Sequence, residues 1–122
     1  MQYYNFKNIG VGIDIIEVAR FKKMPYVSNK NFYKKIFTAS EINYCTKFSE
    51  PYKHFAGKFA IKEAVIKSIT KNVKLSDIVT NHKKSKPTVS IKGNKQYQFL
   101  VSLSHEQRHA IAVVLSKKAP IR

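Results

Sequence analysis

The order of apolar patterns along the 122-residue chain predicts an α+β fold, an antiparallel β-sheet packed with one long helix and shorter helices. An Ile- and Val-rich run with two glycines at residues 9–16 is typical of a buried strand. The longest helical pattern covers residues 51–70, and three β segments follow between Pro87 and Ser116. No repeat, linker or low-complexity segment divides the sequence, so we expect a single domain over residues 1–122.

Short helices are expected between the first strand and the long helix. Residues 17–24 place apolar side chains three apart and predict a short helix or turn. Residues 31–37 predict a helix with its aromatic and aliphatic side chains on one face. Thr38 is followed three residues later by Glu41, the spacing of a capping box, so a further helix should begin there and end near Phe48.

The second half of the chain predicts the long helix and then an antiparallel meander. The helix should begin at Pro51, because proline suits the first helical turn. Residues 75–82 predict a connection or an edge strand. Turns are expected at Gly93-Asn94 and at residues 105–109. They separate three strands, over residues 87–92, 97–104 and 110–116.

The chain is strongly basic, with 23 Lys plus Arg against 7 Asp plus Glu and a formal net charge of +16. Such a domain attracts nucleic acid, anionic lipid, phosphorylated small molecules or acidic proteins. Only three basic residues are Arg, the residue that reads bases through paired hydrogen bonds, whereas lysine is a point charge for phosphate. Because no nucleic-acid-binding motif accompanies the charge, we expect no nucleic acid partner. A solvated surface is the alternative explanation for any single lysine.

Three features bear on where the protein works. No apolar run of about 18 residues exists, so no transmembrane helix is expected. The first residues, MQYYNFKN, lack the apolar core of a signal peptide. Cys45 is the single cysteine, which precludes an internal disulfide and fits a reducing compartment. We expect a cytoplasmic protein without a membrane partner.

Asp14 is out of place inside the most apolar predicted strand. A carboxylate there costs several kcal/mol unless it is paired or bound to a cation. Gly10 and Gly12 leave the neighbouring backbone uncovered, which would let a ligand approach closely. The alternative is an aspartate at the strand end that caps the next helix.

Glu63 and Lys67 lie on a face of the long helix that is otherwise apolar or small, and should therefore point to the core side or a cleft. Together with Asp14, Glu63 would hold a hard divalent cation with open positions, as Mg²⁺ at phosphates requires. Lys67 could then neutralise a phosphate oxygen. The alternative is an ordinary surface pair between Glu63 and Lys67.

The segment Ser102–His105 ends a strand and enters a turn. Backbone amides, hydroxyls and an imidazole at one turn could receive a phosphate, and a polar hairpin end is the alternative. The histidines at positions 54, 82 and 109 show no metal-ligand spacing with Cys45 or with each other, so we expect no zinc site.

These motifs follow one another in a specific order. They are Gly12-Ile13-Asp14-Ile15 with Glu17 and Arg20, then Phe55–Ala64 with Lys67, then Lys86-Pro87, and then Ser102–His105. In this order the chain resembles the holo-acyl-carrier-protein synthases, the small group of 4′-phosphopantetheinyl transferases, from about residue 9 to residue 116. The resemblance implies the small 4′-phosphopantetheinyl transferase fold.

The resemblance implies an enzyme that transfers the 4′-phosphopantetheine group of coenzyme A to a serine of apo acyl carrier protein. It would release adenosine 3′,5′-bisphosphate and support fatty acid and lipid biosynthesis. Mg²⁺ would be required, with Asp14 and Glu63 as its ligands, and Lys67 matches the lysine that contacts the phosphates. A carboxylate or a metal-bound water could take the serine proton, and we favour Glu63 over Asp14. The alternative of a non-catalytic member is disfavoured because these three residues are intact.

The resemblance also implies how coenzyme A binds. Lys58, Lys62 and Lys67 are candidates for its phosphates. The segments Lys86-Pro87 and Ser104-His105 match those that hold the adenine and the 3′-phosphate. Small members of the family are usually trimers, so we expect a homotrimer. Each site would then combine the Asp14 cluster of one subunit with the Lys86 and His105 segments of its neighbour.

The acidic acyl carrier protein should dock by charge. The resemblance implies docking against the segment that follows the first strand, with Arg20, Lys23 and Met24 as contacts.

The sequence departs from the family pattern at two places, both after the long helix. Residues 92–95 predict a tight turn where the family commonly has a short helix, and Ser85 stands where a glycine often precedes the Lys-Pro pair.

Overall fold

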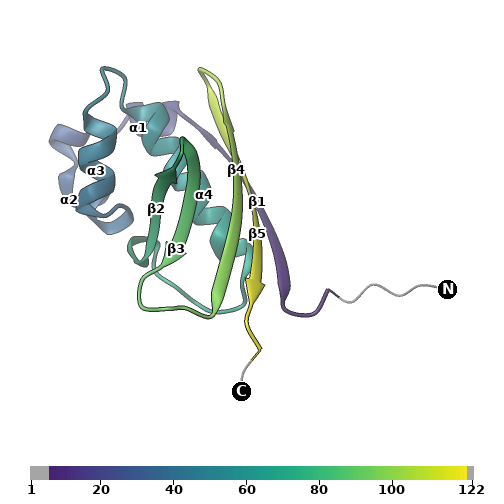
Figure 1. The fold of residues 1–122 in the computed structure, drawn as a ribbon. Helices are drawn as coiled ribbons and strands as arrows, with labels where there is room; N and C mark the ends of the chain where they lie inside the picture. The colour runs from purple at the N-terminus through teal and green to yellow at the C-terminus, as the bar shows by residue number, and fades with distance from the viewer. Residues whose placement is uncertain (1–5, 121–122) are drawn as a thin grey trace.

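Two antiparallel sheets, one long helix and several short helical elements make up the computed structural model, which describes residues 6–120 (Figure 1). The predicted α+β class is confirmed, with small shifts at the ends of the elements. In chain order the elements are β1 (Ile9–Glu17), α1 (Ala19–Lys22), the 3-10 helix η1 (Tyr26–Ser28), α2 (Lys30–Ile36), α3 (Ala39–Thr46), α4 (Tyr52–Ser68), the 3-10 helix η2 (Leu75–Asp77), β2 (Ile78–Lys83), β3 (Lys86–Ile91), β4 (Tyr97–His105) and β5 (His109–Lys118).

The three-stranded sheet has the order β1-β5-β4, so the first strand of the chain lies beside the last. β5 pairs antiparallel with both neighbours, and Asp14 of β1 lies opposite Ala112 of β5. α4 covers one face of this sheet, while β2 and β3 form a separate hairpin beside it (Figure 1). Side chains alternate between the faces: Ala112 and Val114 are buried beneath α4, whereas Ile13 is 59% exposed on the outer face.

Gly10 and Gly12 bring the long helix against the first strand. A Cβ atom on Gly12 would overlap the carbonyl oxygen of Ala64, and one on Gly10 would overlap that of Ser68. The space beside the two glycines is therefore filled by α4. The expectation that a ligand approaches the backbone here was wrong, because the two glycines let α4 pack closely against β1 instead.

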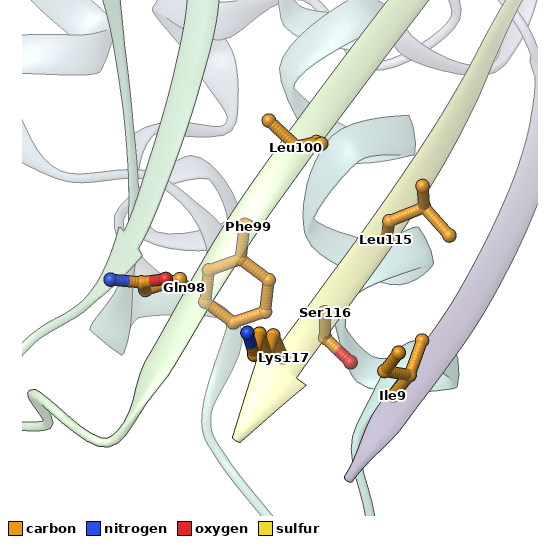
Figure 2. Close-up of a pocket in the computed structure, with 7 residues that line it drawn as sticks. All are labelled: Ile9, Gln98, Phe99, Leu100, Leu115, Ser116 and Lys117. Atoms are coloured by element: carbon orange, nitrogen blue, oxygen red, sulfur yellow. The ribbon is translucent and has the colours of Figure 1, made fainter. Parts of the chain in front are cut away.

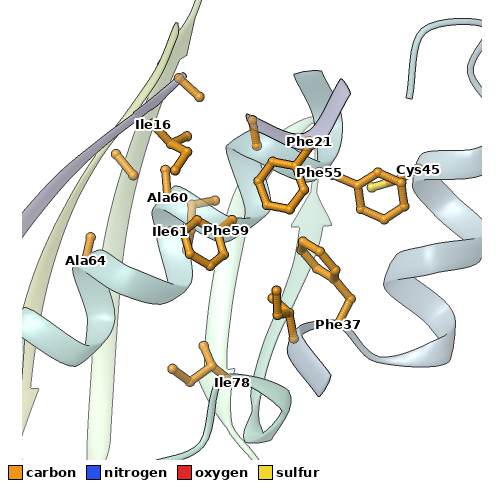
Figure 3. Packing of buried hydrophobic residues seen from close by; sticks show 14 of the residues in the cluster. Ile16, Phe21, Phe37, Cys45, Phe55, Phe59, Ala60, Ile61, Ala64 and Ile78 are labelled. Atoms are coloured by element: carbon orange, nitrogen blue, oxygen red, sulfur yellow. The ribbon is translucent and has the colours of Figure 1, made fainter. Parts of the chain in front are cut away.

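The core lies mostly between α4 and the short helices (Figure 3). On the sheet side, α4 presents small residues such as Ala60 and Ala64. On its other side, the ring of Phe59 packs edge-on against that of Phe21 with a centroid separation of 5.5 Å, and Phe55 lies 4.9 Å from Phe37. α4 is therefore buried on two sides, which fixes the position of its polar side chains.

The turns behave largely as their sequences predict. Gly93 has φ 74° in the connection after β3, and no helix lies between β3 and β4 in the described chain, so the tight turn is confirmed. Lys84 and Ser85 join β2 to β3 with φ values of 52° and 67°. Glycine adopts such a left-handed backbone more readily than the serine at position 85. Within residues 6–120, no helix combines the length and apolar character needed to cross a membrane.

Candidate active site

Asp14 and Lys67 meet where α4 crosses β1. The Nζ atom of Lys67 lies 3.2 Å from Oδ1 of Asp14 and donates a hydrogen bond to the carbonyl oxygen of Ile13 at 3.0 Å. The Lys67 side chain is 53% exposed and that of Asp14 is 15% exposed, so the pair lies at the protein surface with its carboxylate turned inward. Asp14 does not cap the next helix, because α1 begins after Val18 and has no side-chain cap.

Glu63 belongs to the same cluster. Burial raises the pKa of the Glu63 carboxyl, and the charge of Asp14 raises it further, while Lys67 and Arg20 act in the opposite direction. Lys67 forms its ion pair with Asp14 and not with Glu63. The alternative of an ordinary surface pair between Glu63 and Lys67 is therefore wrong. The two carboxylates therefore repel each other across the junction of β1 and α4.

The donor set fits a hard divalent cation. Oδ2 of Asp14 is buried and has no hydrogen-bond partner among the described residues, a costly state for a carboxylate oxygen. A second carboxylate, Glu63, lies close enough for the two charges to interact unfavourably. Residues 6–120 contain no cluster of three or more acidic, His or Cys side chains suited to a metal. Two carboxylates are the usual protein share of a Mg²⁺ site completed by substrate phosphates.

A second group of the expected residues gathers around a cavity of about 130 Å³. Lys58 of α4, Pro87 of β3 and His105 of β4 all line it. Lys86 precedes Pro87 at the start of β3 and is exposed. Ser104 is exposed on the outer face of the sheet, opposite Ile111 and away from this cavity. The structure thus brings the lysine, the proline and the imidazole together and leaves Ser104 apart from them.

Lys62 is in the interior, although it was expected to meet coenzyme A. Its side chain is fully buried, and Nζ lies 2.7 Å from Oε1 of Glu41. Nζ also donates to the carbonyl oxygens of Ile36 and Leu75 at 2.8 and 3.0 Å, so its three protons are used. No ligand in solution can reach this ammonium, so the prediction that Lys62 contacts a phosphate was wrong.

Glu41 links the buried Lys62 to the wall of the cavity through hydrogen bonds. It closes the predicted capping box, because the Thr38 amide donates to Oε1 and the Glu41 amide donates to Oγ1 of Thr38. Its Oε2 accepts the Thr80 hydroxyl at 2.6 Å, and Lys58 in turn donates to Oγ1 of Thr80 at 2.9 Å. Burial alone would raise the pKa of Glu41, but hydrogen bonds from Lys62 and Thr80 hold it below its ordinary value.

The residues expected to dock the carrier protein follow β1 directly. Arg20 is exposed, and its guanidinium lies 5.2 Å from the centroid of the Phe59 ring. Lys23 is exposed, while Met24 is half-buried and its carbonyl oxygen accepts the Tyr33 hydroxyl at 2.7 Å. Because Arg20 also lowers the pKa of Glu63, this segment adjoins the carboxylate cluster.

Sequence reasoning missed two residues of the cavity. His54 of α4 and His82 of β2 line it together with Lys58 and His105. They were considered only as metal ligands, and their spacing gave no sign that they meet. The signal that could have found them is their chemistry, since both carry imidazoles, which can contact a phosphate, on elements that flank the predicted phosphate segments.

The two clusters define a class of protein. A carboxylate pair beside a lysine is suited to phosphoryl chemistry, and a basic cavity is suited to a nucleotide. Residues 10–114 match the family description "4′-phosphopantetheinyl transferase superfamily". A holo-[acyl-carrier-protein] synthase from Thermodesulfovibrio yellowstonii is 40% identical over 109 residues, covering 87% of this chain and 96% of its own. The same-named protein from Clostridium tetani is 39% identical, covering 85% and 91%.

Solved structures agree with this grouping. The structure of a holo-(acyl-carrier-protein) synthase from Bacillus anthracis in complex with CoA (3′,5′-ADP) superposes with a TM-score of 0.76 at 32% identity, covering 90% of this chain and 96% of that one. The Helicobacter pylori synthase in complex with coenzyme A gives 0.74 at 30% identity, covering 88% and 99%. The chain therefore belongs to the holo-[acyl-carrier-protein] synthases of the 4′-phosphopantetheinyl transferase superfamily.

Proposed function

We propose that this protein transfers the 4′-phosphopantetheine group of coenzyme A to a serine of apo acyl carrier protein, with Mg²⁺, in support of fatty acid biosynthesis in the cytoplasm. The observation that carries the proposal is the buried, unpartnered Oδ2 of Asp14 beside Glu63 and Lys67. Relatives with this activity in their names span most of the chain.

The reaction follows from the chemistry of this cluster. The serine oxygen forms a bond to the phosphorus that carries the pantetheine arm, the bond to adenosine 3′,5′-bisphosphate breaks, and the serine proton must be accepted. Mg²⁺, when held by Asp14 and Glu63, would neutralise charge on the pyrophosphate. Lys67, fixed by Ile13 and Asp14, would contact a phosphate oxygen. Glu63 is the favoured acceptor of the serine proton, since its carboxylate lies with Asp14 and Lys67 where the substrate phosphates would bind.

The nucleotide end of coenzyme A is assigned to the cavity lined by Lys58, Pro87 and His105. Lys58 is held by Thr80 and lies 4.7 Å from the centroid of the Tyr44 ring, so its ammonium is a fixed cation at the cavity wall. By resemblance, Lys86 and Ser104 belong to the same adenine and 3′-phosphate segments. Lys62 is left out of this set because it is fully buried.

A homotrimer would use the outer face of the three-stranded sheet. Apolar side chains there are exposed on all three strands, including Val11 at 63%, Ile15 at 60% and Leu100 at 72%. Figure 2 shows Ile9, Leu100 and Leu115 from three different strands beside a pocket of about 480 Å³. An apolar face of this extent is typical of an interaction surface, and a second and third copy would cover it.

The carrier protein is expected to meet Arg20, Lys23 and Met24. The position of Arg20 near Glu63 supports this, because a docked serine must reach the carboxylate cluster. A basic surface would speed the encounter with an acidic partner and would weaken with salt.

Mass spectrometry tests the proposed function. Apo acyl carrier protein incubated with coenzyme A, Mg²⁺ and this protein should gain the mass of one phosphopantetheine group. The same mixture with Asp14→Asn in place of the wild type is the matched control and should give the gain at a rate roughly a hundredfold lower or less. If the wild type leaves the carrier mass unchanged, the proposed function is wrong.

A further inference from the structure

The basic cavity contains an unusual set of titratable side chains. Lys53, His54, Lys58, His82 and His105 line it, and none of its other lining residues in the described chain is acidic. Two ammonium groups and three imidazoles thus share one small space. Such an unbalanced set attracts an anion strongly, but it also opposes the charging of its own histidines.

Aromatic contacts hold the imidazoles in place around Tyr44 of α3. His54 stacks on Phe48 with ring centroids 3.7 Å apart and an interplanar angle of 18°. The Tyr44 ring lies 6.2 Å from His54 and 5.0 Å from His82, and Lys58 lies over the same ring. The ring nitrogens of His54 and His82 have no hydrogen-bond partner among the described residues, so they are open to a ligand.

The groups facing these histidines come from every element around the cavity. α4 contributes Lys53 and Lys58, β4 contributes His105, and α3 contributes the phenol of Tyr44. Burial lowers the pKa of His54, and the charges of Lys53, His105, Lys58 and His82 lower it further. Burial and Lys58 likewise lower the pKa of His82. The free cavity therefore favours the neutral form of both imidazoles, and each can still take up a proton.

We propose that the cavity binds the phosphate monoester of the nucleotide together with a net uptake of protons by His54 and His82. This inference rests on the proposed function, which places the nucleotide end of coenzyme A here, and it adds two ligand-binding residues and a pH dependence. A phosphate dianion replaces the repulsion from the neighbouring cations with attraction, which favours the imidazolium form. Affinity for the ligand then rises as pH falls, by about tenfold per pH unit for one proton taken up.

Calorimetry measures the proton directly. Adenosine 3′,5′-bisphosphate is titrated into the full-length protein at pH 7.0, in two phosphate-free buffers that differ in their heat of ionisation. The ligand phosphates are then mostly dianionic, since their second pKa is about 6. We expect an uptake of roughly one proton per chain. Adenosine 5′-monophosphate, which lacks the 3′-phosphate, should bind with a smaller uptake.

Variants locate the proton. The His54→Gln, His82→Gln double variant should lose most of the uptake and most of the difference in affinity between pH 7.0 and 8.0. His54→Phe preserves a ring against Phe48 while removing the titratable nitrogens, so it separates titration from packing. His109→Gln is the matched control, since His109 is bonded to Glu106 and is not among the cavity residues. It should keep the wild-type uptake.

The outcomes separate this inference from the proposed function. Equal binding heats in the two buffers would overturn the inference, as would an uptake that survives in the double variant, because another titratable group of the cavity would then be its source. In either case carrier protein could still gain phosphopantetheine, and the proposed function would stand. Failure of the wild type both to bind the bisphosphate and to modify carrier protein would overturn both.

Discussion

Two lysines of α4, five residues apart, form ion pairs of opposite kinds. Lys62 meets Glu41 at 2.7 Å with both side chains fully buried, whereas Lys67 meets Asp14 at 3.2 Å with its own side chain half exposed. Every proton of the Lys62 ammonium has a partner in the protein. At the second pair, Oδ2 of Asp14 is left unpartnered. Breaking a satisfied buried pair destabilises the fold, whereas an unsatisfied pair is suited to bind a further charge.

The largest expected effect concerns the buried pair. Lys62→Met leaves the Glu41 carboxylate buried without its cation, so we expect the free energy of unfolding to fall by about 3–5 kcal/mol. Chemical denaturation followed by circular dichroism measures this. The double variant Glu41→Gln, Lys62→Met removes both charges and should recover part of the loss. A loss below about 1 kcal/mol in the single variant would mean that the pair is not structural.

The exposed pair should respond in the opposite way. Asp14→Asn removes the carboxylate proposed to hold the cation, so transfer to carrier protein should fall roughly a hundredfold or more. Because the substitution removes the charge repulsion between Asp14 and Glu63, the free energy of unfolding should change little or increase. Turnover is measured at saturating coenzyme A. Near-normal turnover of Asp14→Asn with Mg²⁺ present would contradict the assignment of the metal site.

The pH dependence of the free energy of unfolding tests the role of the Glu63 carboxyl beside the exposed pair. Its pKa is raised in the folded protein, so its protonated form favours folding and the carboxylate opposes it. In metal-free solution, Glu63→Gln should therefore be slightly more stable than wild type above the ordinary pKa of glutamate and equal to it well below.

The Glu63 titration itself can be followed by carbon NMR of the carboxyl. Its midpoint should shift downward in Asp14→Asn, because a neighbouring negative charge has been removed. An unchanged midpoint would show that the two carboxylates do not interact.

The smallest effect is expected at the docking segment. Arg20→Glu should raise the KM for carrier protein more than the KM for coenzyme A, and the difference should shrink as salt is added. Lys71→Glu, on the surface after α4, provides a control with the same change of charge. Equal effects of Arg20→Glu on both substrates would argue against docking at this segment.

The sequence predicted the helices and strands well because their signals are local. The capping box of Thr38 and Glu41 and the turn at Gly93 depend on neighbouring residues alone. Two errors arose where distant segments meet. Gly12 suggested an approach for a ligand, but it makes room for Ala64 of α4. Lys62 looked like a phosphate contact, since nothing nearby in the sequence shows that Glu41 reaches it.

The candidate site was predicted in part for the same reason. Asp14, Glu63 and Lys67 could be grouped because an acidic residue in an apolar strand and a polar face on a helix are visible in the sequence. The cavity residues His54 and His82 come from different elements, and only the folded chain brings them beside Lys58.

The contrast between the two ion pairs can be tested by one measurement, the rate of phosphopantetheine transfer per folded molecule in Asp14→Asn and Lys62→Met. Mass spectrometry of carrier protein gives the rate, and the folded fraction is taken from circular dichroism of the same samples. Asp14→Asn should be fully folded and inactive, and Lys62→Met should be less stable yet active per folded molecule. An active Asp14→Asn, or a folded but inactive Lys62→Met, would contradict the division of roles between the two pairs.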